Sequence, residues 1–291
     1  MTLPRETIKT TCSYCGVGCG IEVTRDSQGR LSVSGDESHP VNRGMLCSKG
    51  RTIHHVVQQK EDRLLTPQMR RSRAHPLEEV DWDTALDRAA GVFKSIIDRF
   101  GPEAVGFYVS GQCLTEEYYV VNKLMKGFIG SNNIDTNSRL CMSSAVVGYK
   151  LALGDDTCPI SYEDIELGSC FMIAGANPAW CHPILYRRLE EHKEANPDVK
   201  IIVVDPRETQ SCALADMHLQ IQPGTDVVLY NALARELRAQ GFWDHDFIEN
   251  HCNGGEALKE TIFKVTNAEA ARICRIPPEQ IVEAARLIGE S

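Results

Sequence analysis

Four cysteines near the start of the chain carry the strongest chemical signal in the sequence. Cys12, Cys15 and Cys19 are separated by two and three residues, and 27 residues lie between Cys19 and Cys47. Three closely spaced thiolates can hold three corners of one iron–sulfur cube, and a fourth thiolate completes it. A zinc ribbon would instead favour two separated cysteine pairs or a closely spaced histidine pair. We therefore expect an iron–sulfur cluster, with zinc or unliganded buried cysteines as the alternatives.

Three glycines alternate with these cysteines, namely Gly16, Gly18 and Gly20. Glycine lets the backbone turn tightly, so we expect amide N–H groups to point toward the sulfides of a cluster. Lys49 follows shortly after Cys47, and a lysine at such a position is ordinarily a solvated surface charge. The spacing of the cysteines, and not the lysine, carries the prediction of a cluster.

The composition is that of a folded, acidic protein. The 291 residues are 42% hydrophobic and 24% charged, and 40 acidic residues against 31 basic ones give a net charge of −9. No basic stripe offers a surface to nucleic-acid phosphates, so we expect no nucleic-acid partner. No apolar run approaches the roughly 20 residues of a membrane helix, so we also expect no membrane span.

The N-terminus and the use of cysteine predict the compartment. Residues 1–11 contain no apolar export segment, and the pair Arg70-Arg71 lies too deep in the chain to act as a twin-arginine signal. We therefore expect a cytoplasmic protein. In that reducing compartment the twelve cysteines are expected to be metal ligands or buried thiols, and not disulfide partners.

Hydrophobic patterning predicts the elements that position the first half of the chain. Residues 20–35 alternate between apolar and polar side chains, as a β-hairpin does. Asp83 is expected to cap an amphipathic helix that ends at Gly101-Pro102. A strand is expected directly afterwards, at residues 104–109. The hairpin would hold the chain just after the first cysteines.

The second half predicts alternating strands and helices. The apolar runs 171–174 and 201–204 predict two strands, with a helix opened by Pro183 between them. Such alternation is typical of a parallel sheet that binds ligands at the carboxyl ends of its strands. We therefore predict an α/β fold, in which a small N-terminal β-rich iron–sulfur domain precedes α/β modules with a doubly wound, mostly parallel sheet. Further helices are expected at 226–239 and from near Asp244 and Pro278.

The cysteine segment resembles a known enzyme family. The run Cys12-Ser13-Tyr14-Cys15-Gly16-Val17-Gly18-Cys19-Gly20, with Cys47-Ser48-Lys49-Gly50, is similar to the opening of the oxidoreductases that bind two molybdopterin guanine dinucleotides. These include nitrate reductases and formate dehydrogenases. The resemblance implies a 4Fe-4S cluster on the four cysteines, and it implies that Lys49 lies between that cluster and a pterin on the electron path.

A second segment, from Asp135 to Ala145, resembles the part of these enzymes that supplies the protein ligand to molybdenum. Cys141 would be that ligand, because a soft thiolate suits a metal otherwise bound by dithiolene sulfurs. The alternative is a buried cysteine that enters a helix. The stretch from Phe107 to Gly154 is similar to the cytoplasmic assimilatory nitrate reductases in particular.

Other residues, in loops and at strand ends, resemble contacts to the pterin dinucleotide. The resemblance implies N–H groups for a pyrophosphate, and carboxylates for ribose hydroxyls or guanine N–H groups. Taken singly, such residues are more often simple caps and turns. The candidates are Gln112, Asn137, Gly175, Asn177, His182, Asp205, Arg207, Thr209, Gly224, Thr225 and Asp226.

The resemblance also implies a reaction, the molybdenum-dependent reduction of nitrate to nitrite. Electrons would come from a ferredoxin, a flavodoxin or an NADH-oxidising subunit and enter through the cluster. Arg139 is a candidate to attract the anion, although a single arginine more often pairs with a carboxylate. Met142 stands where formate dehydrogenases place a histidine. Formate dehydrogenase and a non-catalytic iron–sulfur electron-transfer subunit are the alternatives, and Cys141 argues against the second.

These features predict three segments along the chain. Residues 1–62 would form the 4Fe-4S domain, residues 63–136 an α/β segment of a discontinuous domain, and residues 137–291 a Rossmann-like domain that binds the dinucleotide. Members of the family are considerably longer than 291 residues. We therefore expect the C-terminal modules that complete the second dinucleotide site to be absent from this chain.

Overall fold

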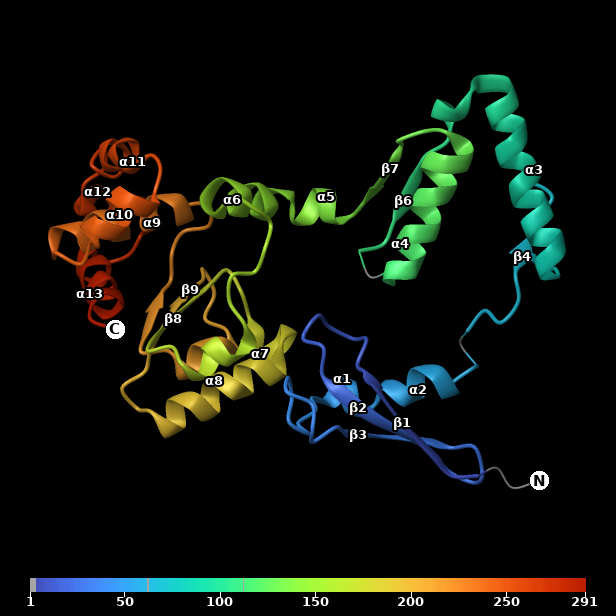
Figure 1. Cartoon of the computed structure of the whole chain (residues 1–291), viewed down its shortest axis with the longest axis horizontal. Coiled ribbons are helices and arrows are strands. Elements are labelled where there is room, and N and C mark those ends of the chain that lie inside the picture. The colour runs from blue at the N-terminus through green and yellow to red at the C-terminus, as the bar shows by residue number, and fades with distance from the viewer. Residues whose placement is uncertain (1–3, 62, 112) are drawn as a thin grey trace. The chain divides into compact units, whose positions relative to one another are not determined.

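The computed structural model describes residues 4–61, 63–111 and 113–291 (Figure 1). The chain folds into two compact units, of which the first comprises residues 1–58 and 160–291 and the second residues 59–159. The segment limits that the sequence indicates stay predictions. Within the described residues, no helix combines the length and the apolar character needed to cross a lipid bilayer.

An antiparallel sheet forms the N-terminal part of the first unit. β2 (Gly20–Arg25) pairs on one side with β1 (Glu6–Thr11) and on the other with β3 (Leu31–Gly35). The hairpin predicted at residues 20–35 is therefore confirmed. The patterning does not predict β1, because all six of its side chains are exposed and no apolar face marks the strand. Two short helices follow, α1 (Ser48–Arg51) and α2 (Ile53–Gln58).

A parallel sheet of three strands forms the centre of the rest of this unit. The strands are β8 (Cys170–Ala174), β9 (Lys200–Val204) and β10 (Met217–Leu219), in the order β10-β9-β8. Side chains of the central strand alternate between two apolar cores, since Ile202 lies in one core and Ile201 in the other. A strand buried on both faces reads as a continuous apolar run, which is why the sequence predicts β9 well.

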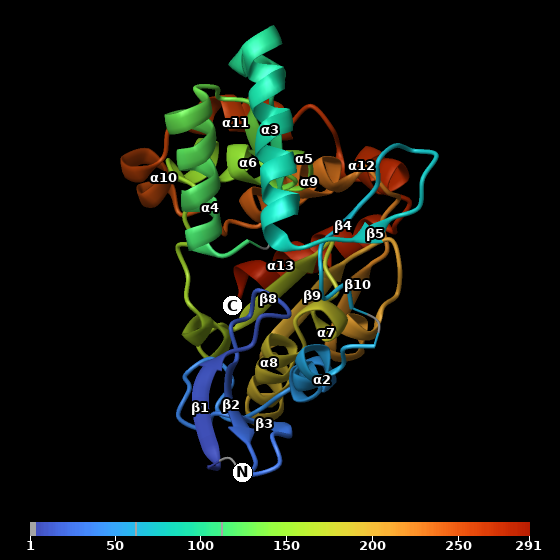
Figure 2. The ribbon, with the colours of Figure 1, turned by 90° about the vertical axis from the view of Figure 1, so that its right-hand side faces the viewer.

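Helices cover both faces of this sheet, as a doubly wound fold requires (Figure 2). One core is closed by α9, α12 and α13, and the other by α8. The helix that Pro183 opens and the helix at 226–239 are confirmed. The bounds are η3 (Tyr162–Glu166), α7 (Pro178–Cys181), α8 (Pro183–Ala195), η4 (Gln210–Leu214), α9 (Asp226–Ala239), α10 (His245–His251), α11 (Gly255–Ile262), α12 (Asn267–Cys274) and α13 (Pro278–Gly289).

The second unit begins with the amphipathic helix α3 (Trp82–Phe100), and its cap differs from the prediction. Asp81, and not Asp83, caps the helix, because its extended backbone lets its Oδ1 accept the N–H of Thr84 at 2.7 Å. The following strand is also shorter than predicted, because residues 102–104 form a 3-10 turn. The other elements are β4 (Gln68–Met69), β5 (Glu78–Glu79), η1 (Pro102–Ala104), β6 (Phe107–Val109), α4 (Thr115–Asn122), the π-helix η2 (Lys123–Ile129), β7 (Ile134–Thr136), α5 (Ser138–Cys141) and α6 (Ser143–Leu153).

Arg188 of α8 joins the two chain segments that make up the first unit. Its side chain is 2% exposed, so its guanidinium must find partners inside the protein. Nε donates to Glu166 at 2.6 Å, Nη1 to the carbonyl of Val41 at 3.0 Å, and Nη2 to the carbonyl of Tyr162 at 3.1 Å. One arginine thereby ties α8 and η3 to the segment that leads to the fourth cysteine.

The same junction reaches the loop of the first three cysteines. The hydroxyl of Tyr162 donates to the carbonyl of Val17 at 3.1 Å, and Val17 lies between Cys15 and Cys19 in the sequence. Val17 also packs in a small apolar core with Ile184 of α8. Contacts with η3 and α8 therefore fix the conformation of the cysteine loop, in addition to the hairpin that follows it.

The buried side chain of Asn42 joins two segments of the N-terminal domain by hydrogen bonds. It is completely buried, and its Oδ1 accepts the N–H of Gly20 at 2.7 Å. Its Nδ2 donates to the carbonyls of Gly20, at 3.0 Å, and Met45, at 2.9 Å. One amide thus joins the residue after Cys19 to the turn that precedes Cys47, which brings distant parts of the cysteine motif together.

The Arg188–Glu166 pair predicts a pH-dependent stability. Glu166→Gln should lower the free energy of unfolding by about 1 to 3 kcal/mol near neutral pH, because it leaves a buried guanidinium without its anion. Arg188 holds the pKa of Glu166 below its usual value, so the stabilisation is complete above the unfolded pKa of about 4.3 and is lost as pH falls through the folded pKa. Denaturant unfolding between pH 3 and 7 should show the two proteins converging in acid.

The control for this experiment is Asp98→Asn, which removes an exposed ion pair with Lys94 on α3. Such surface pairs contribute little, so its unfolding midpoint should match wild type at every pH. A stability difference for Glu166→Gln that stayed constant down to pH 3 would contradict the pairing.

The buried amide of Asn42 yields a second prediction. Asn42→Leu has a similar volume but leaves the N–H and carbonyl of Gly20 and the carbonyl of Met45 without partners, at a cost of about 1 to 3 kcal/mol for each buried group. The cysteine loop should open locally, and a maleimide should label Cys12 and Cys19 faster under native conditions. Mass spectrometry of the labelled peptides gives the rates. Asn250→Leu, at an exposed helical position, should leave them unchanged.

Candidate functional site

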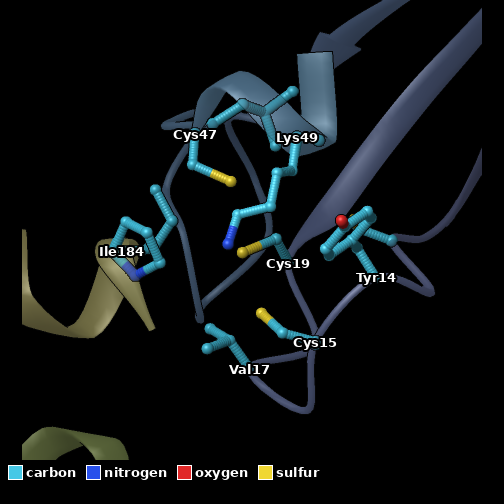
Figure 3. Close-up of a pocket in the computed structure, with 12 residues that line it drawn as sticks. Tyr14, Cys15, Val17, Cys19, Cys47, Lys49 and Ile184 are labelled. Atoms are coloured by element: carbon cyan, nitrogen blue, oxygen red, sulfur yellow. The ribbon is translucent and has the colours of Figure 1, made fainter. Parts of the chain in front are cut away.

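The four predicted cluster cysteines surround one pocket. Cys12 and Cys19 are buried, while Cys15 and Cys47 are partly exposed. The pocket has an empty volume of about 360 Å³, part of it open to solvent. Figure 3 shows the sulfurs of Cys15, Cys19 and Cys47 directed into it, with Ile184 of α8 on the opposite side. Residues separated by up to 35 positions are thereby gathered at one point.

Two of the three interleaved glycines are required by the backbone here. Gly18 has φ +79°, a left-handed conformation that other residues rarely adopt, and it reverses the chain just before Cys19. A Cβ on Gly20 would lie 2.4 Å from the ring of His39. Gly16 has open space around it and an ordinary backbone, so it is not required in the same way. The N–H of Cys12 donates to the carbonyl of Cys19 at 2.8 Å and closes the loop.

The surroundings of Cys19 in the pocket disfavour its thiolate form. Burial raises the pKa of the Cys19 thiol to about 11, and the other three cysteines add to the rise by charge repulsion. Cys19 therefore needs nearby positive charge to become a thiolate near neutral pH. A bound metal supplies that charge and displaces the protons, which is how thiolate sites acquire their metals.

The donor set of the pocket fits an iron–sulfur cluster. Four thiols line it, and neither histidine nor carboxylate does. In the described part of the chain, no three His, Cys, Asp or Glu side chains converge as the ligands of a single metal ion do. A cubane does not need that convergence, because each thiolate binds a different iron. The pocket therefore suits a 4Fe-4S cluster.

Lys49 crosses the mouth of this pocket. Its side chain runs from α1 over the cysteines, and Figure 3 shows the nitrogen directed toward Cys19. The Nζ donates to the carbonyl of Trp180 at 3.0 Å and lies 5.3 Å from the centre of the Tyr14 ring. These two contacts fix the position of the Lys49 ammonium, which is therefore not a freely solvated surface charge.

The carboxyl ends of the parallel strands carry most of the dinucleotide candidates. Gly175 follows β8 with φ +59°, and its N–H donates to the carbonyl of Val204 at 2.9 Å. Asp205 follows β9 directly, and its Oδ1 accepts the N–H of Arg207 at 2.8 Å. Because the strands are parallel, these loops share one edge of the sheet. The loop after β10 supplies Gly224, with φ +82°, Thr225 and Asp226 at the start of α9.

Asn177 offers an unused donor at this edge. Its Oδ1 accepts the hydroxyl of Ser211 at 2.5 Å, whereas its Nδ2 is buried and has no hydrogen-bond partner. Thr209 caps η4 and helps place Ser211, which is completely buried. His182 is exposed between α7 and α8. A buried amide N–H without a partner fits a bound group that accepts from it, as a phosphate or a pterin does.

Cys141, the predicted molybdenum ligand, belongs to the second unit. It ends the short helix α5 and is exposed in this chain, as is Met142. Arg139 pairs with Asp135 at 2.9 Å and is mostly exposed, which matches the ordinary reading of a single arginine. The Oδ1 of Asn137 accepts the N–H of Gly111. Gln112, another candidate, lies outside the described residues.

Sequence reasoning misses the residues that support this site. An asparagine beside a glycine turn predicts only a turn, so nothing local indicates that Asn42 is buried. Arg188 offers a weak signal, because it lies four residues after Ile184 and therefore on the buried face of α8. Tyr14 and Tyr162 act through contacts with chain segments more than 30 residues away, which no local pattern predicts.

Two family models match the chain. Residues 5–59 match the molybdopterin oxidoreductase Fe4S4 domain, and residues 63–245 match molybdopterin oxidoreductase. The first range contains all four pocket cysteines, and the second contains Cys141 and most of the strand-end loops. Both models agree with the resemblance that the two cysteine motifs carry, including its 4Fe-4S cluster and molybdopterin.

Individual relatives point the same way. A nitrate reductase of Klebsiella oxytoca is 47% identical over 94% of this chain and 30% of its own length. A periplasmic nitrate reductase of Desulfovibrio desulfuricans is 42% identical over 99% of this chain and 39% of its own. The F420-dependent formate dehydrogenase 1 subunit alpha of Methanococcus maripaludis is 37% identical over 98% and 41%. The chain thus spans 30 to 41% of the lengths of these relatives.

The fold has a solved counterpart. Acetylene hydratase from Pelobacter acetylenicus superposes with a TM-score of 0.83 at 25% identity, over 95% of this chain and 38% of that one. This agreement confirms the α/β architecture with its small β-rich N-terminal part. Together with the family models, which cover most of the sequence, it shows that the chain belongs to the molybdopterin oxidoreductase family.

Proposed function

We propose that the chain is the electron-entry and cofactor-binding part of a molybdenum-dependent nitrate reductase. The observation that carries the proposal is the pocket in which four thiols gather beneath the Lys49 ammonium. The identities of 42 and 47% to nitrate reductases support nitrate as the substrate. Because the chain spans less than half of these relatives, the activity is proposed for a protein that also has their remaining portion.

The roles of the chain's residues follow from their positions. The four cysteines would hold the cluster, and Lys49 would lie on the path from the cluster to a pterin. Cys141 would bind molybdenum as a soft thiolate, and its exposure leaves it free to do so. The bound cofactors supply the redox chemistry, in which nitrate, two protons and two electrons give nitrite and water.

The strand-end loops would bind a molybdopterin guanine dinucleotide, one of two per molecule. The unpaired Nδ2 of Asn177 can donate to a phosphate or pterin oxygen. Asp205 and Asp226 can accept from ribose hydroxyls or guanine N–H groups. Arg207 is exposed and unpaired by any carboxylate in the described part of the chain, so it is available to an anionic group.

Within this proposal we place the protein among the cytoplasmic assimilatory enzymes, with a ferredoxin, a flavodoxin or an NADH-oxidising subunit as donor. The resemblance of residues 107–154 supports this choice. Formate oxidation is the rival, because a formate dehydrogenase is 37% identical. Met142 favours nitrate, since a thioether has no proton to exchange near neutral pH and cannot replace a histidine there.

The cluster itself yields a prediction for the chain as it stands. Anaerobically reconstituted protein should hold about four irons and four sulfides, and Cys47→Ser should lose them because it removes one of the four ligands. Iron and acid-labile sulfide assays give the count. Cys252→Ser, at an exposed cysteine outside the pocket, should bind as wild type does. Stoichiometric zinc with no iron would exclude the proposed electron entry.

The substrate is tested on the protein extended by the portion that its relatives possess. One cofactor-loaded preparation should reduce nitrate with a low-potential donor and oxidise formate negligibly. Cys141→Ser should lower nitrate turnover by orders of magnitude and leave the cluster's electron paramagnetic resonance signal intact, because the two sites use separate ligands. Cys252→Ser again serves as the control. Faster formate oxidation than nitrate reduction would overturn the substrate assignment and spare the family.

A further inference from the structure

Lys49 is held in place by two neutral groups. The ring of Tyr14 lies 5.3 Å from its Nζ, and the carbonyl of Trp180 accepts from it at 3.0 Å. In the described part of the chain, no carboxylate pairs with it. A carboxylate would cancel the charge of the ammonium, whereas a π face and a carbonyl hold the cation and leave its full charge on the pocket.

We propose that Tyr14 is a positioning residue, which holds the Lys49 ammonium over the cysteine pocket and thereby raises the reduction potential of the cluster. The inference rests on the proposed function and deepens it. A cluster that gains an electron becomes more negative, so a nearby fixed cation stabilises the reduced form. The same cation bound loosely in solvent would be screened and would favour the reduced form less.

Tyr14 is suited to this role by its place in the chain. It lies between Cys12 and Cys15, so its ring is fixed to the same loop as the proposed ligands. Its side chain is 53% exposed, so it is not part of a core whose loss would unfold the domain. Its ring is also the side-chain contact of Lys49 that substitution can remove, since the other contact is a backbone carbonyl present in any variant.

The second contact places Lys49 between the two proposed cofactor sites. Trp180 belongs to α7. The hydroxyl of Ser211 in η4 accepts the N–H of Ala179 at 3.2 Å and so fixes α7 to η4. The ring of Trp180 lies 6.0 Å from the guanidinium of Arg207, at the end of β9. The ammonium therefore lies between the cysteine loop and the strand-end loops. The contact with the Tyr14 ring keeps it close to the cysteines.

A redox titration of the reconstituted chain tests the proposal. The cluster takes one electron from dithionite, and its resonance signal gives the reduced fraction at each potential. Tyr14→Leu should lower the ratio of reduced to oxidised cluster at a fixed potential by roughly three- to tenfold, where tenfold corresponds to about 59 mV. Tyr14→Phe keeps the π face and should match wild type. Lys49→Met should lower the ratio at least as far as Tyr14→Leu.

The double variant separates positioning from general damage to the loop. If Tyr14 acts through Lys49, adding Tyr14→Leu to Lys49→Met should produce no further change. Additive shifts, or a Tyr14→Phe protein that behaves as Tyr14→Leu does, would overturn the inference. Loss of the cluster in Tyr14→Leu but not in Lys49→Met would also overturn it, because Tyr14 would then be needed for assembly. Absence of iron from the wild-type chain would instead overturn the proposed function, and the inference with it.

Discussion

The buried guanidinium of Arg188 is the constraint on which the first unit depends. A cation that is 2% exposed needs partners inside the protein, and its three partners come from two distant stretches of chain, η3 and the segment that contains Val41. Satisfying it fixes α8 against the N-terminal domain and sets η3 beneath the cysteine loop. The apolar contact of Ile184 with that loop follows from the same placement. The shape of the cysteine pocket depends on α8, because Arg188 fixes that helix and Ile184 on the same helix lines the pocket.

Elements with a local physical cause could be predicted from the sequence. β9 is buried on both faces, so it appears as an uninterrupted apolar run, and the hairpin alternates because one face is covered. The four cysteines could be assigned to one site because their spacing restricts the chemistry, and the structure brings them to one pocket. Two helices could also be predicted locally. Pro183 marks the start of one, and the amphipathic pattern of residues 226–239 indicates the other.

Features that depend on distant contacts could not be predicted. β1 has no apolar face and forms because β2 offers hydrogen bonds. The choice of Asp81 over Asp83 as the cap is a local one, but it depends on which residue has an extended backbone, and the sequence pattern does not indicate that. Asn42 and Arg188 are polar residues whose burial is decided by segments far along the chain. For Cys141 the sequence gives a chemical identity but no geometry, since its role requires a cofactor.

The electrostatics of the pocket connect folding with function. Burial, together with charge repulsion from the three neighbouring cysteines, raises the pKa of the Cys19 thiol, so the site resists accumulating negative charge without metal. The chain as a whole is acidic, which adds to that resistance. A lysine paired with a carboxylate would leave this balance unchanged, whereas a lysine held by a ring and a carbonyl alters it. Neutral partners therefore let the fold keep one uncancelled positive charge at the place where electrons are expected to enter.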